Sequence, residues 1–304
     1  MQYRRLGKTE LNVSVIGVGT WQFGGEWGHD YTQLEVDQIL NQAKEEGINF
    51  IDTAECYGDH LSESFIGDYL KRDKREDWIV ATKFGHYFHS HMNRTDGYGA
   101  EDALTQLDRS LLALQTDYID LYQFHSGNDE AFNNDKLWTM LDKQVQAGKI
   151  RHLGISLNKS NSMHQVTHTP DVGASVIQIV YNRLDRTPEQ DVFPACERLD
   201  LGVLARVPLA SGLLSGKYKF GVQFPNNDVR ARLNGEVLDQ QLLQIAKIQE
   251  EEVPQGTPMA QWALAWCLRH PAVTCVIPGC KDAAQVRSNA AAVQWIESDH
   301  PQIV

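Results

Sequence analysis

The stretch from Ile51 to Gly58, which reads IDTAECYG, places an acid and a phenol close together. Asp52 comes at the end of a short apolar run, and Tyr57 follows five residues later, just before a glycine. The apolar run predicts a buried strand, and a strand end and the loop after it can face one pocket. Asp52 and Tyr57 are therefore the first two candidate catalytic residues.

Polar residues also end several other predicted strands. In chain order they are Lys83, His125, Ser156 and, within its strand, Gln178. Each has an ordinary structural explanation, since a strand-end Asp often caps a helix, a strand-end Lys is often solvated and a lone His usually packs in the core. Their convergence on successive strands favours a shared site.

The elements that must position these residues alternate along the chain. We expect a β-hairpin from Tyr3 to Leu6 and Asn12 to Val15, and then strands at residues 16–19, 50–52, 78–83, 118–125, 150–156, 175–181, 202–206 and 274–277. Helices are predicted between them at about 32–47, 62–71, 101–114, 135–147, 160–167, 189–199, 238–251, 259–270 and from 282. Thr32 and Glu35 form a capping-box pattern.

Eight strands that alternate with helices predict parallel βαβ units. The expected fold is therefore an α/β, (β/α)8 TIM barrel with an N-terminal β-hairpin. We find no linker, and expect residues 1–304 to form a single barrel domain. In such a barrel the carboxyl ends of the strands carry the active site.

Composition excludes several function classes. The net charge of −12 disfavours a broad nucleic-acid-binding face. No apolar stretch is long enough to predict a membrane span, and the charged N-terminus predicts no secretory signal. The five cysteines are odd in number and form no CxxC pair, which favours a reducing cytoplasm. We expect no nucleic-acid or membrane partner, and a monomer or weak oligomer.

Two glycine-rich segments have the wrong spacing for nucleotide-binding motifs. In GVGTWQFGG the glycine after Gly19 is Gly24, which does not fit GxGxxG. In SGLLSGK three residues separate Gly212 from Gly216, where a Walker A loop needs four. Neither a Rossmann-type nor a P-loop site is supported.

The chain resembles an aldo-keto reductase, of the bacterial branch that also resembles potassium-channel β subunits. The matching stretches are IDTAECYG, ATKFG, DYIDLYQFH, GKIRHLGIS, QIVYN, PLASGLLSGKY and IPGCKDAAQVRSN, which span roughly the whole chain. The resemblance implies a catalytic tetrad of Asp52, Tyr57, Lys83 and His125. It also implies an NADPH-dependent oxidoreductase that reduces aldehydes or ketones to alcohols, with hydride from the nicotinamide and a proton from Tyr57.

The chemistry of the tetrad suits this reaction. A free tyrosine has a pKa of about 10, and the ammonium of Lys83 is expected to lower it. Asp52 would supply the counter-charge of a buried Lys83. His125 would hydrogen-bond the carbonyl oxygen and orient it, and these donors would stabilise the negative charge that develops there.

The resemblance also implies that NADPH or NADP+ lies across the barrel mouth. Gly19 and Thr20 would lie near the ribose, while Ser156 and Gln178 would hold the nicotinamide carboxamide. The pyrophosphate would be wrapped by Pro208, Leu209, Ser211, Leu213, Ser215 and Lys217. The adenosine end would meet Gly279, Lys281, Gln285 and Asn289, next to a helix N-terminus near Asp282. Lys281 would pair with a 2′-phosphate, unless it is an ordinary solvated lysine.

Two positions depart from the family pattern. Arg206 stands where many members have an aromatic residue that stacks on the nicotinamide, and its planar guanidinium can either stack or point toward substrate. Leu157 follows Ser156 where many members have Asn, and Asn158 is one residue further on.

On the substrate side, Trp21 is expected to form a pocket wall, and residues 84–99 a long loop at the mouth. His86, His89 and His91 raise the question of a metal, but no Cys is near and Asp96 is the only acid, so we expect no metal site. Cys56 is either a reactive thiol or a small buried filler. The apolar walls favour a neutral aldehyde or ketone.

Two other function classes remain open. One is a regulatory or redox-sensor subunit that binds nicotinamide with little turnover. The other is a barrel aldolase with Lys83 as its Schiff-base residue. The complete tetrad favours a reductase over the regulatory subunit. The cofactor segments favour a reductase over an aldolase, because an aldolase would have no use for them.

Overall fold

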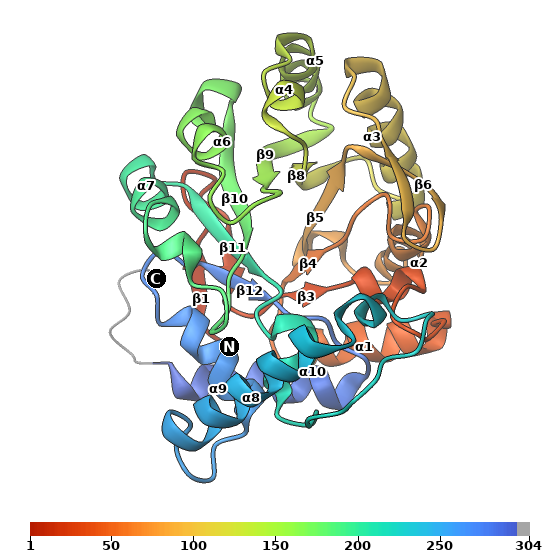
Figure 1. The fold of residues 1–304 in the computed structure, drawn as a ribbon. Coiled ribbons are helices and arrows are strands. Elements are labelled where there is room, and N and C mark those ends of the chain that lie inside the picture. The colour runs from red at the N-terminus through yellow and green to blue at the C-terminus, as the bar shows by residue number, and fades with distance from the viewer. Residues whose placement is uncertain (297–304) are drawn as a thin grey trace.

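The computed structural model describes residues 1–296, which form an eight-stranded parallel barrel surrounded by helices (Figure 1). The strands, in spatial order, are β3 (Val18–Gly19), β4 (Phe50–Asp52), β5 (Ile79–Phe84), β8 (Ile119–His125), β9 (Ile150–Ser156), β10 (Ala174–Val180), β11 (Gly202–Arg206) and β12 (Cys275–Ile277). Parallel bridges from Ile16 to Val276 and from Gly19 to Gly279 close the ring. The predicted (β/α)8 barrel is confirmed.

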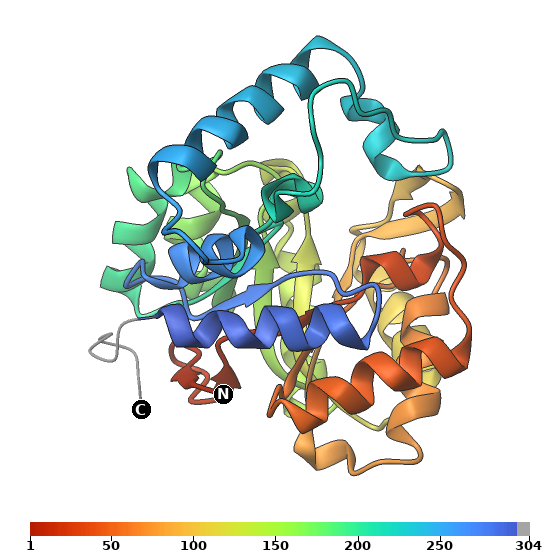
Figure 2. The same cartoon turned by 90° about the horizontal axis from the view of Figure 1, so that it is seen from below.

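The predicted N-terminal hairpin closes one end of this barrel. Strands β1 (Tyr3–Arg5) and β2 (Asn12–Ser14) pair antiparallel. Leu6 and Val13 pack against apolar residues inside the barrel, among them Phe50 and Val176 near the starts of β4 and β10. Because this plug fills the amino-terminal end, the opposite end, where the strands finish, is left for a site (Figure 2).

The helices follow the predicted order along the chain, with one short helix, α4 (Asp129–Phe132), that was not predicted. They are α1 (Gln33–Glu45), α2 (Leu61–Leu70), α3 (Ala100–Leu114), α4, α5 (Asp135–Gln146), α6 (Met163–His168), α7 (Val192–Leu199), α8 (Glu236–Glu251), α9 (Met259–Leu268) and α10 (Ala283–Ala290). The capping box of Thr32 and Glu35 is present at the start of α1, and Asp282 caps α10. No helix among residues 1–296 has the length and apolarity to cross a bilayer.

The long loop expected over residues 84–99 contains regular secondary structure. This segment contains the antiparallel hairpin β6 (His86–Ser90) and β7 (Asn93–Asp96). Arg94 ties the hairpin to Glu26 and to the carbonyl oxygen of Cys56, and these contacts lie far away in sequence. Local sequence patterns could not show that the segment has such partners.

The segment after β11 crosses the mouth of the barrel. It contains the 3-10 helices η5 (Ala210–Ser215) and η6 (Val229–Leu233). The backbone N–H of Val229 donates to the carbonyl oxygen of Glu26 at 2.9 Å, so the crossing ends against the loop after β3. Figure 2 shows η6 at the end of the molecule opposite the N-terminal hairpin. We call residues 207–234 the crossing segment.

Candidate active site

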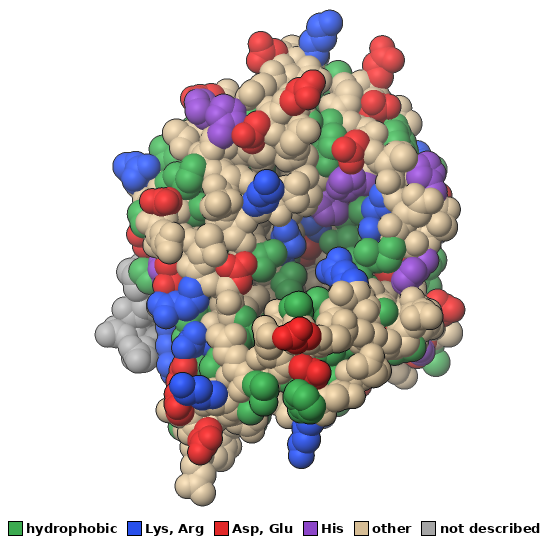
Figure 3. Space-filling model, viewed as in Figure 1, with side chains coloured by type: hydrophobic (Ala, Val, Ile, Leu, Met, Phe, Trp, Pro, Cys, Tyr) green, Lys and Arg blue, Asp and Glu red, His purple; other side chains and the backbone are tan. Residues whose placement is uncertain are grey.

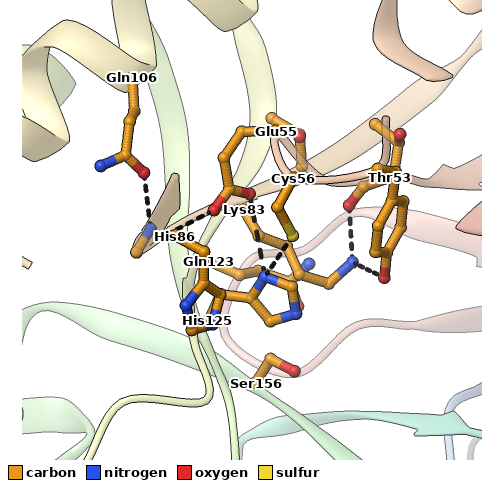
Figure 4. A network of polar contacts seen from close by, with 12 residues as sticks. Thr53, Glu55, Cys56, Lys83, His86, Gln106, Gln123, His125 and Ser156 are labelled. Atoms are coloured by element: carbon orange, nitrogen blue, oxygen red, sulfur yellow. Dashed lines mark hydrogen bonds and ion pairs between the residues drawn. The ribbon is translucent and has the colours of Figure 1, made fainter. Parts of the chain in front are cut away.

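Lys83 lies in β5 near its carboxyl end, at the centre of a buried polar cluster (Figure 4). Its Nζ atom lies 2.7 Å from Asp52 Oδ1, 2.6 Å from the carbonyl oxygen of Thr53 and 3.3 Å from the hydroxyl oxygen of Tyr57. Asp52 is the last residue of β4, which pairs with β5, so the two charged groups end neighbouring strands. The barrel therefore brings three members of the predicted tetrad into contact.

The second carboxylate oxygen of Asp52 accepts two side-chain amides. Gln123 Nε2 donates at 3.1 Å and Gln178 Nε2 at 2.6 Å. Donors on both oxygens offset the cost of burying this carboxylate. Sequence reasoning missed Gln123, although a glutamine inside the apolar run LYQF has to find a partner within the barrel.

The ionisation of the tyrosine differs from the sequence-based expectation. Burial raises the pKa of Tyr57 to about 12, although the charge of Lys83 acts to lower it. The expected net lowering is therefore wrong for this structure, because desolvation of the phenolate outweighs the neighbouring ammonium. Burial also acts to lower the pKa of Lys83, but Asp52 and Tyr57 outweigh it and hold that pKa above its ordinary value. The cluster thus pairs a neutral phenol with a protonated amine.

His125 ends β8 and faces Tyr57 across the site. The two ring centroids lie 6.2 Å apart with the rings nearly perpendicular. Burial, and then the charges of His86 and Lys83, lower the pKa of His125 well below its ordinary value. A neutral imidazole at this position can donate one hydrogen bond to a substrate oxygen without carrying charge.

Trp21 lies beside Tyr57 on the other side. Its ring stacks at a centroid distance of 6.0 Å and an interplanar angle of 21°. Its Nε1 donates to Glu26 Oε2 at 2.6 Å, and the buried Glu26 also pairs with Arg94 of β7. The ring of Trp21, the expected pocket wall, is therefore held by Glu26, which is held in turn by the β6–β7 hairpin. Figure 3 shows this face of the molecule hollowed near its centre, with basic and histidine side chains at the hollow.

The residues predicted to hold the nicotinamide carboxamide lie together at the ends of β9 and β10. Ser156 Oγ donates to Gln178 Oε1 at 3.2 Å. Gln178 Nε2 is engaged inside the barrel by Asp52 and by Gln123 Oε1, so only its oxygen is left for a ligand. Asn158 is exposed.

Arg206 ends β11 and turns across the neighbouring strand ends. One guanidinium nitrogen donates to the carbonyl oxygen of Leu157 at 3.0 Å, next to Ser156. Its Nε is buried and has no hydrogen-bond partner among the described residues. Burial lowers the pKa of this guanidinium, against the opposing charges of Tyr57 and Asp52. A buried donor without a partner is the kind of group that a ligand satisfies.

The crossing segment begins with a strained backbone. Val207, Ala210 and Ser211 have φ values of 55°, 47° and 58°, in the left-handed region that side chains disfavour. For the β-branched Val207 this is a true outlier, and such strain gathers at ligand-binding sites. Pro208 and Leu209 lie within this turn, and the carbonyl oxygen of Leu209 accepts from two later backbone N–H groups.

Leu213, Ser215 and Lys217, the later residues of the predicted pyrophosphate-binding set, lie in different environments. Leu213 is buried in a small core with α8 and α9, so only its backbone remains for a cofactor. Ser215 Oγ donates to the carbonyl oxygen of Gly212 at 2.6 Å. Lys217 is exposed, with its ammonium over the ring of Tyr218.

Near the ribose, Gly19 and Gly279 form the bridge that closes the barrel. A Cβ atom on Gly19 would lie 2.7 Å from the carbonyl oxygen of Ile277, so a larger residue would open this seam. The hydroxyl of Thr20 donates to the carbonyl oxygen of Asp52 at 2.9 Å. The side chain of Thr20 is therefore used to position β4.

At the predicted adenosine end, Lys281 is exposed and precedes α10. Gln285 Oε1 accepts from the backbone N–H of Lys281 at 3.0 Å, and Asn289 Nδ2 donates to Cys280 Sγ at 3.4 Å. The amide oxygen of Gln285 and the amide nitrogen of Asn289 thus already have local partners with which adenine would have to compete.

Comparison with known proteins settles the family. The sequence profile of the Aldo/keto reductase family matches residues 15–303. The chain belongs to the aldo/keto reductase family. It is 32% identical to an uncharacterized oxidoreductase, YrpG, of Bacillus subtilis (strain 168), over 97% of this chain and 91% of that protein. Other relatives, 27% and 28% identical, are named as probable or putative voltage-gated potassium-channel β subunits.

Solved structures agree with this assignment. Aldo-keto reductase AKR11C1 from Bacillus halodurans, in its holo form, has a TM-score of 0.80 and 31% identity, covering 97% of this chain and 91% of that chain. Glycerol dehydrogenase AKR11B4 from Gluconobacter oxydans has a TM-score of 0.85 and 27% identity, covering 98% and 92%. The resemblance inferred from the sequence is confirmed for family and fold.

The residues of this aldo/keto reductase fit a nicotinamide dinucleotide, the usual cofactor of the family. The unpartnered Nε of Arg206 and the oxygen of Gln178 offer a donor and an acceptor at the strand ends. Lys217 and Lys281 are exposed cations along the two segments that would hold phosphates. Charge and hydrogen-bonding type both suit the group.

Two of the histidines on the β6–β7 hairpin have polar side-chain partners. His86 pairs with Asp96, and His89 bonds the hydroxyl of Thr95. The metal-binding residue types converge elsewhere, where ligand atoms of Glu55, Cys56 and His125 lie within 4.8 Å of one another. Sequence reasoning missed Glu55, although an acid beside two candidate groups was a signal.

Proposed function

We propose that this protein is an NADPH-dependent aldo-keto reductase that reduces neutral aldehydes or ketones to alcohols. The observation that carries the proposal is the contact of Lys83 Nζ with both Asp52 and Tyr57, with His125 facing the same phenol. NADPH, when bound, supplies the hydride that adds to the carbonyl carbon. The residues of the chain provide the proton and hold the carbonyl oxygen.

Tyr57 is the proton donor in this proposal. The O–H bond of Tyr57 breaks as the carbonyl oxygen takes its proton, and the electron pair stays on the phenolate oxygen. Lys83 lies 3.3 Å from that oxygen and stabilises the charge, while Asp52 keeps the ammonium in place. His125 donates a hydrogen bond to the same carbonyl oxygen and fixes its direction.

The aldolase alternative does not fit this arrangement. A Schiff-base lysine must lose its proton to attack a carbonyl. Asp52 and Tyr57 instead hold the pKa of Lys83 above its ordinary value, after the opposing effect of burial. Borohydride treatment with candidate aldehydes should therefore leave Lys83 unmodified.

We also propose that residues 1–304 act as one domain, as a monomer or weak oligomer in the cytoplasm. One observation supports the single domain and another supports the cytoplasmic location. The barrel and its helices share one main hydrophobic core among the described residues, and all five cysteines are buried and unpaired.

The test is NADPH oxidation, followed by absorbance, against a panel of aldehydes and ketones. Turnover of at least one carbonyl that is lost in the Tyr57→Phe variant supports the reductase. Tight NADPH binding without turnover of any carbonyl contradicts it and favours the regulatory subunit, a role suggested by the relatives named as channel β subunits.

A further inference from the structure

Glu55 is a buried acid that the proposed mechanism does not use. It lies on the segment between β4 and Tyr57 and is 2% exposed. Its Oε1 atom accepts the backbone N–H of His86 at 2.9 Å (Figure 4). Its Oε2 atom is buried and has no hydrogen-bond partner among the described residues, yet lies 3.8 Å from His125 Nδ1. A buried carboxyl oxygen aimed at a catalytic imidazole requires an explanation.

A proton explains this arrangement better than a metal ion. The thiol of Cys56 lies 3.8 Å from the same Nδ1, so the three residues resemble a ligand set. The charged and titratable groups around His125 are His86 of β6, Lys83 of β5, Arg206 of β11, Arg94 of β7 and Tyr57. Those around Glu55 are Glu63 of α2, Lys83, Cys56, Tyr98 and Tyr122. Three of these groups, Lys83, Arg94 and Arg206, are cations, which oppose a divalent ion at this point.

Protonated neighbours determine which imidazole nitrogen carries the hydrogen. Burial raises the pKa of Glu55 to about 8 and that of the Cys56 thiol well above its ordinary value, so both groups keep their protons near neutrality. Since Oε1 of Glu55 already accepts from His86, its proton belongs on Oε2. His125 Nδ1 then faces two donors and must accept, which leaves the ring hydrogen on Nε2.

We propose that protonated Glu55 is a positioning residue that holds His125 as its Nε2–H tautomer, and that loss of this proton reverses the tautomer. The 3.8 Å separation exceeds a hydrogen bond, so the side chains must approach by roughly 1 Å. No protein group among the described residues bonds Nε2, which is therefore free to donate to a carbonyl oxygen. This role rests on the proposed function.

Ionisation of Glu55 has a definite consequence. A Glu55 carboxylate can only accept, so it draws the ring proton of His125 to Nδ1. Nε2 then presents a lone pair to the substrate oxygen and repels it. Carbonyl reduction should fall as pH rises through about 8, well before Tyr57 titrates near its pKa of about 12.

The direct test is nitrogen-15 NMR of the full chain with labelled histidine, from about pH 6 to about pH 10. The signals of His125 are identified by their loss in His125→Gln. We expect Nδ1 to be unprotonated at the low end and protonated at the high end. A tautomer that is the same throughout overturns the proposal, and this reading does not depend on any enzyme activity.

Glu55→Gln is the matched variant. The N–H of His86 should orient the amide oxygen as it orients Oε1, which leaves the amide NH2 facing Nδ1. In this variant His125 should keep the Nε2–H tautomer over the whole pH range. The fall of kcat/KM for a test aldehyde at alkaline pH should disappear. Asp96→Asn makes the same change at an exposed acid that faces His86, and should keep the wild-type profile.

The outcomes separate the two proposals. A tautomer change in the wild type that is absent in Glu55→Gln supports the role of Glu55, whether or not any carbonyl is reduced. A lack of turnover would contradict only the proposed function. An identical change in both proteins assigns the titration to another group and overturns the role of Glu55. If Glu55→Gln does not fold, Glu55→Met replaces it as the variant that cannot titrate at this position, and a tautomer change that persists in it overturns the role of Glu55.

Discussion

The Nζ atom of Lys83 lies 3.3 Å from the hydroxyl oxygen of Tyr57, although 26 residues separate the two in the chain. The same nitrogen lies 2.7 Å from Asp52 Oδ1. Negative charge that forms on the phenol during proton transfer therefore appears next to a cation that already has its own counter-ion. This relationship produces the first two predictions.

Replacing Tyr57 by Phe should lower kcat by about 100-fold or more, because the proton donor is lost while the ring remains. The dissociation constant for NADPH should stay within about threefold, since no cofactor contact is proposed for the hydroxyl. Steady-state kinetics and fluorescence titration measure the two quantities. Equal loss of turnover and cofactor affinity would contradict the assigned role.

Replacing Asp52 by Asn should lower both activity and stability. The buried ammonium of Lys83 would lose its counter-ion, and breaking a buried pair costs about 3–5 kcal/mol. Chemical denaturation measures the stability, and kcat measures the activity. Asp108→Asn is the control, since Lys149 and Asp108 form an ion pair with both side chains largely exposed, whose loss should cost about 1 kcal/mol or less. Equal effects of the two substitutions would show that Lys83 does not depend on Asp52.

Glu55→Gln should stabilise the fold relative to wild type, increasingly so as pH rises. The pKa of Glu55 is raised to about 8 in the folded protein, so the folded state binds the proton more tightly than the unfolded state. The stability of the wild type is therefore full at low pH and falls between about pH 4.5 and about pH 8, by a few kcal/mol. Gln cannot titrate.

Urea denaturation of both proteins at several pH values checks this prediction. The difference in unfolding free energy should grow across that window and then level off. A difference that does not vary with pH would mean that Glu55 is ionised throughout.

Lys281→Ala should reduce the preference for NADPH over NADH, because the ammonium is proposed to pair with the 2′-phosphate. We expect NADPH affinity to fall by about tenfold and NADH affinity to change little. Lys74→Ala, an exposed lysine on the connection between α2 and β5, is the control. An unchanged preference for NADPH would show that Lys281 is a solvated surface lysine without a role in cofactor binding.

Arg4→Met should destabilise the fold without affecting the site. Arg4 is fully buried, and its guanidinium donates to the carbonyl oxygens of Val273 at 2.6 Å and Leu268 at 2.9 Å. Leaving two buried acceptors unpaired should cost about 2–5 kcal/mol. Thermal unfolding measures the loss, and an unchanged NADPH dissociation constant below the transition would show that the barrel mouth is intact. A cost under about 1 kcal/mol would mean that water replaces the guanidinium.

Local patterns in the sequence were sufficient for most of the framework. The strand at Ile150–Ser156 has the predicted bounds, the capping box at Thr32 is present, and the last helix starts next to Asp282 as predicted. These features depend on neighbouring residues, because side-chain periodicity and capping are set within a few positions of the chain. The hairpin at 86–96 was missed because Glu26, which pairs with its Arg94, lies 68 residues away in the sequence.

The sequence by itself determined the barrel, the family and the members of the candidate tetrad, since these follow from local periodicity and from motifs in fixed order. Only the tertiary structure decided that Gln123 and Gln178 both donate to Asp52, across 71 and 126 residues. It alone decided that the pKa of Tyr57 is raised and that Glu55 faces His125. The physical reason is that burial and long-range contact arise when the ring of strands closes, and no local pattern carries either quantity.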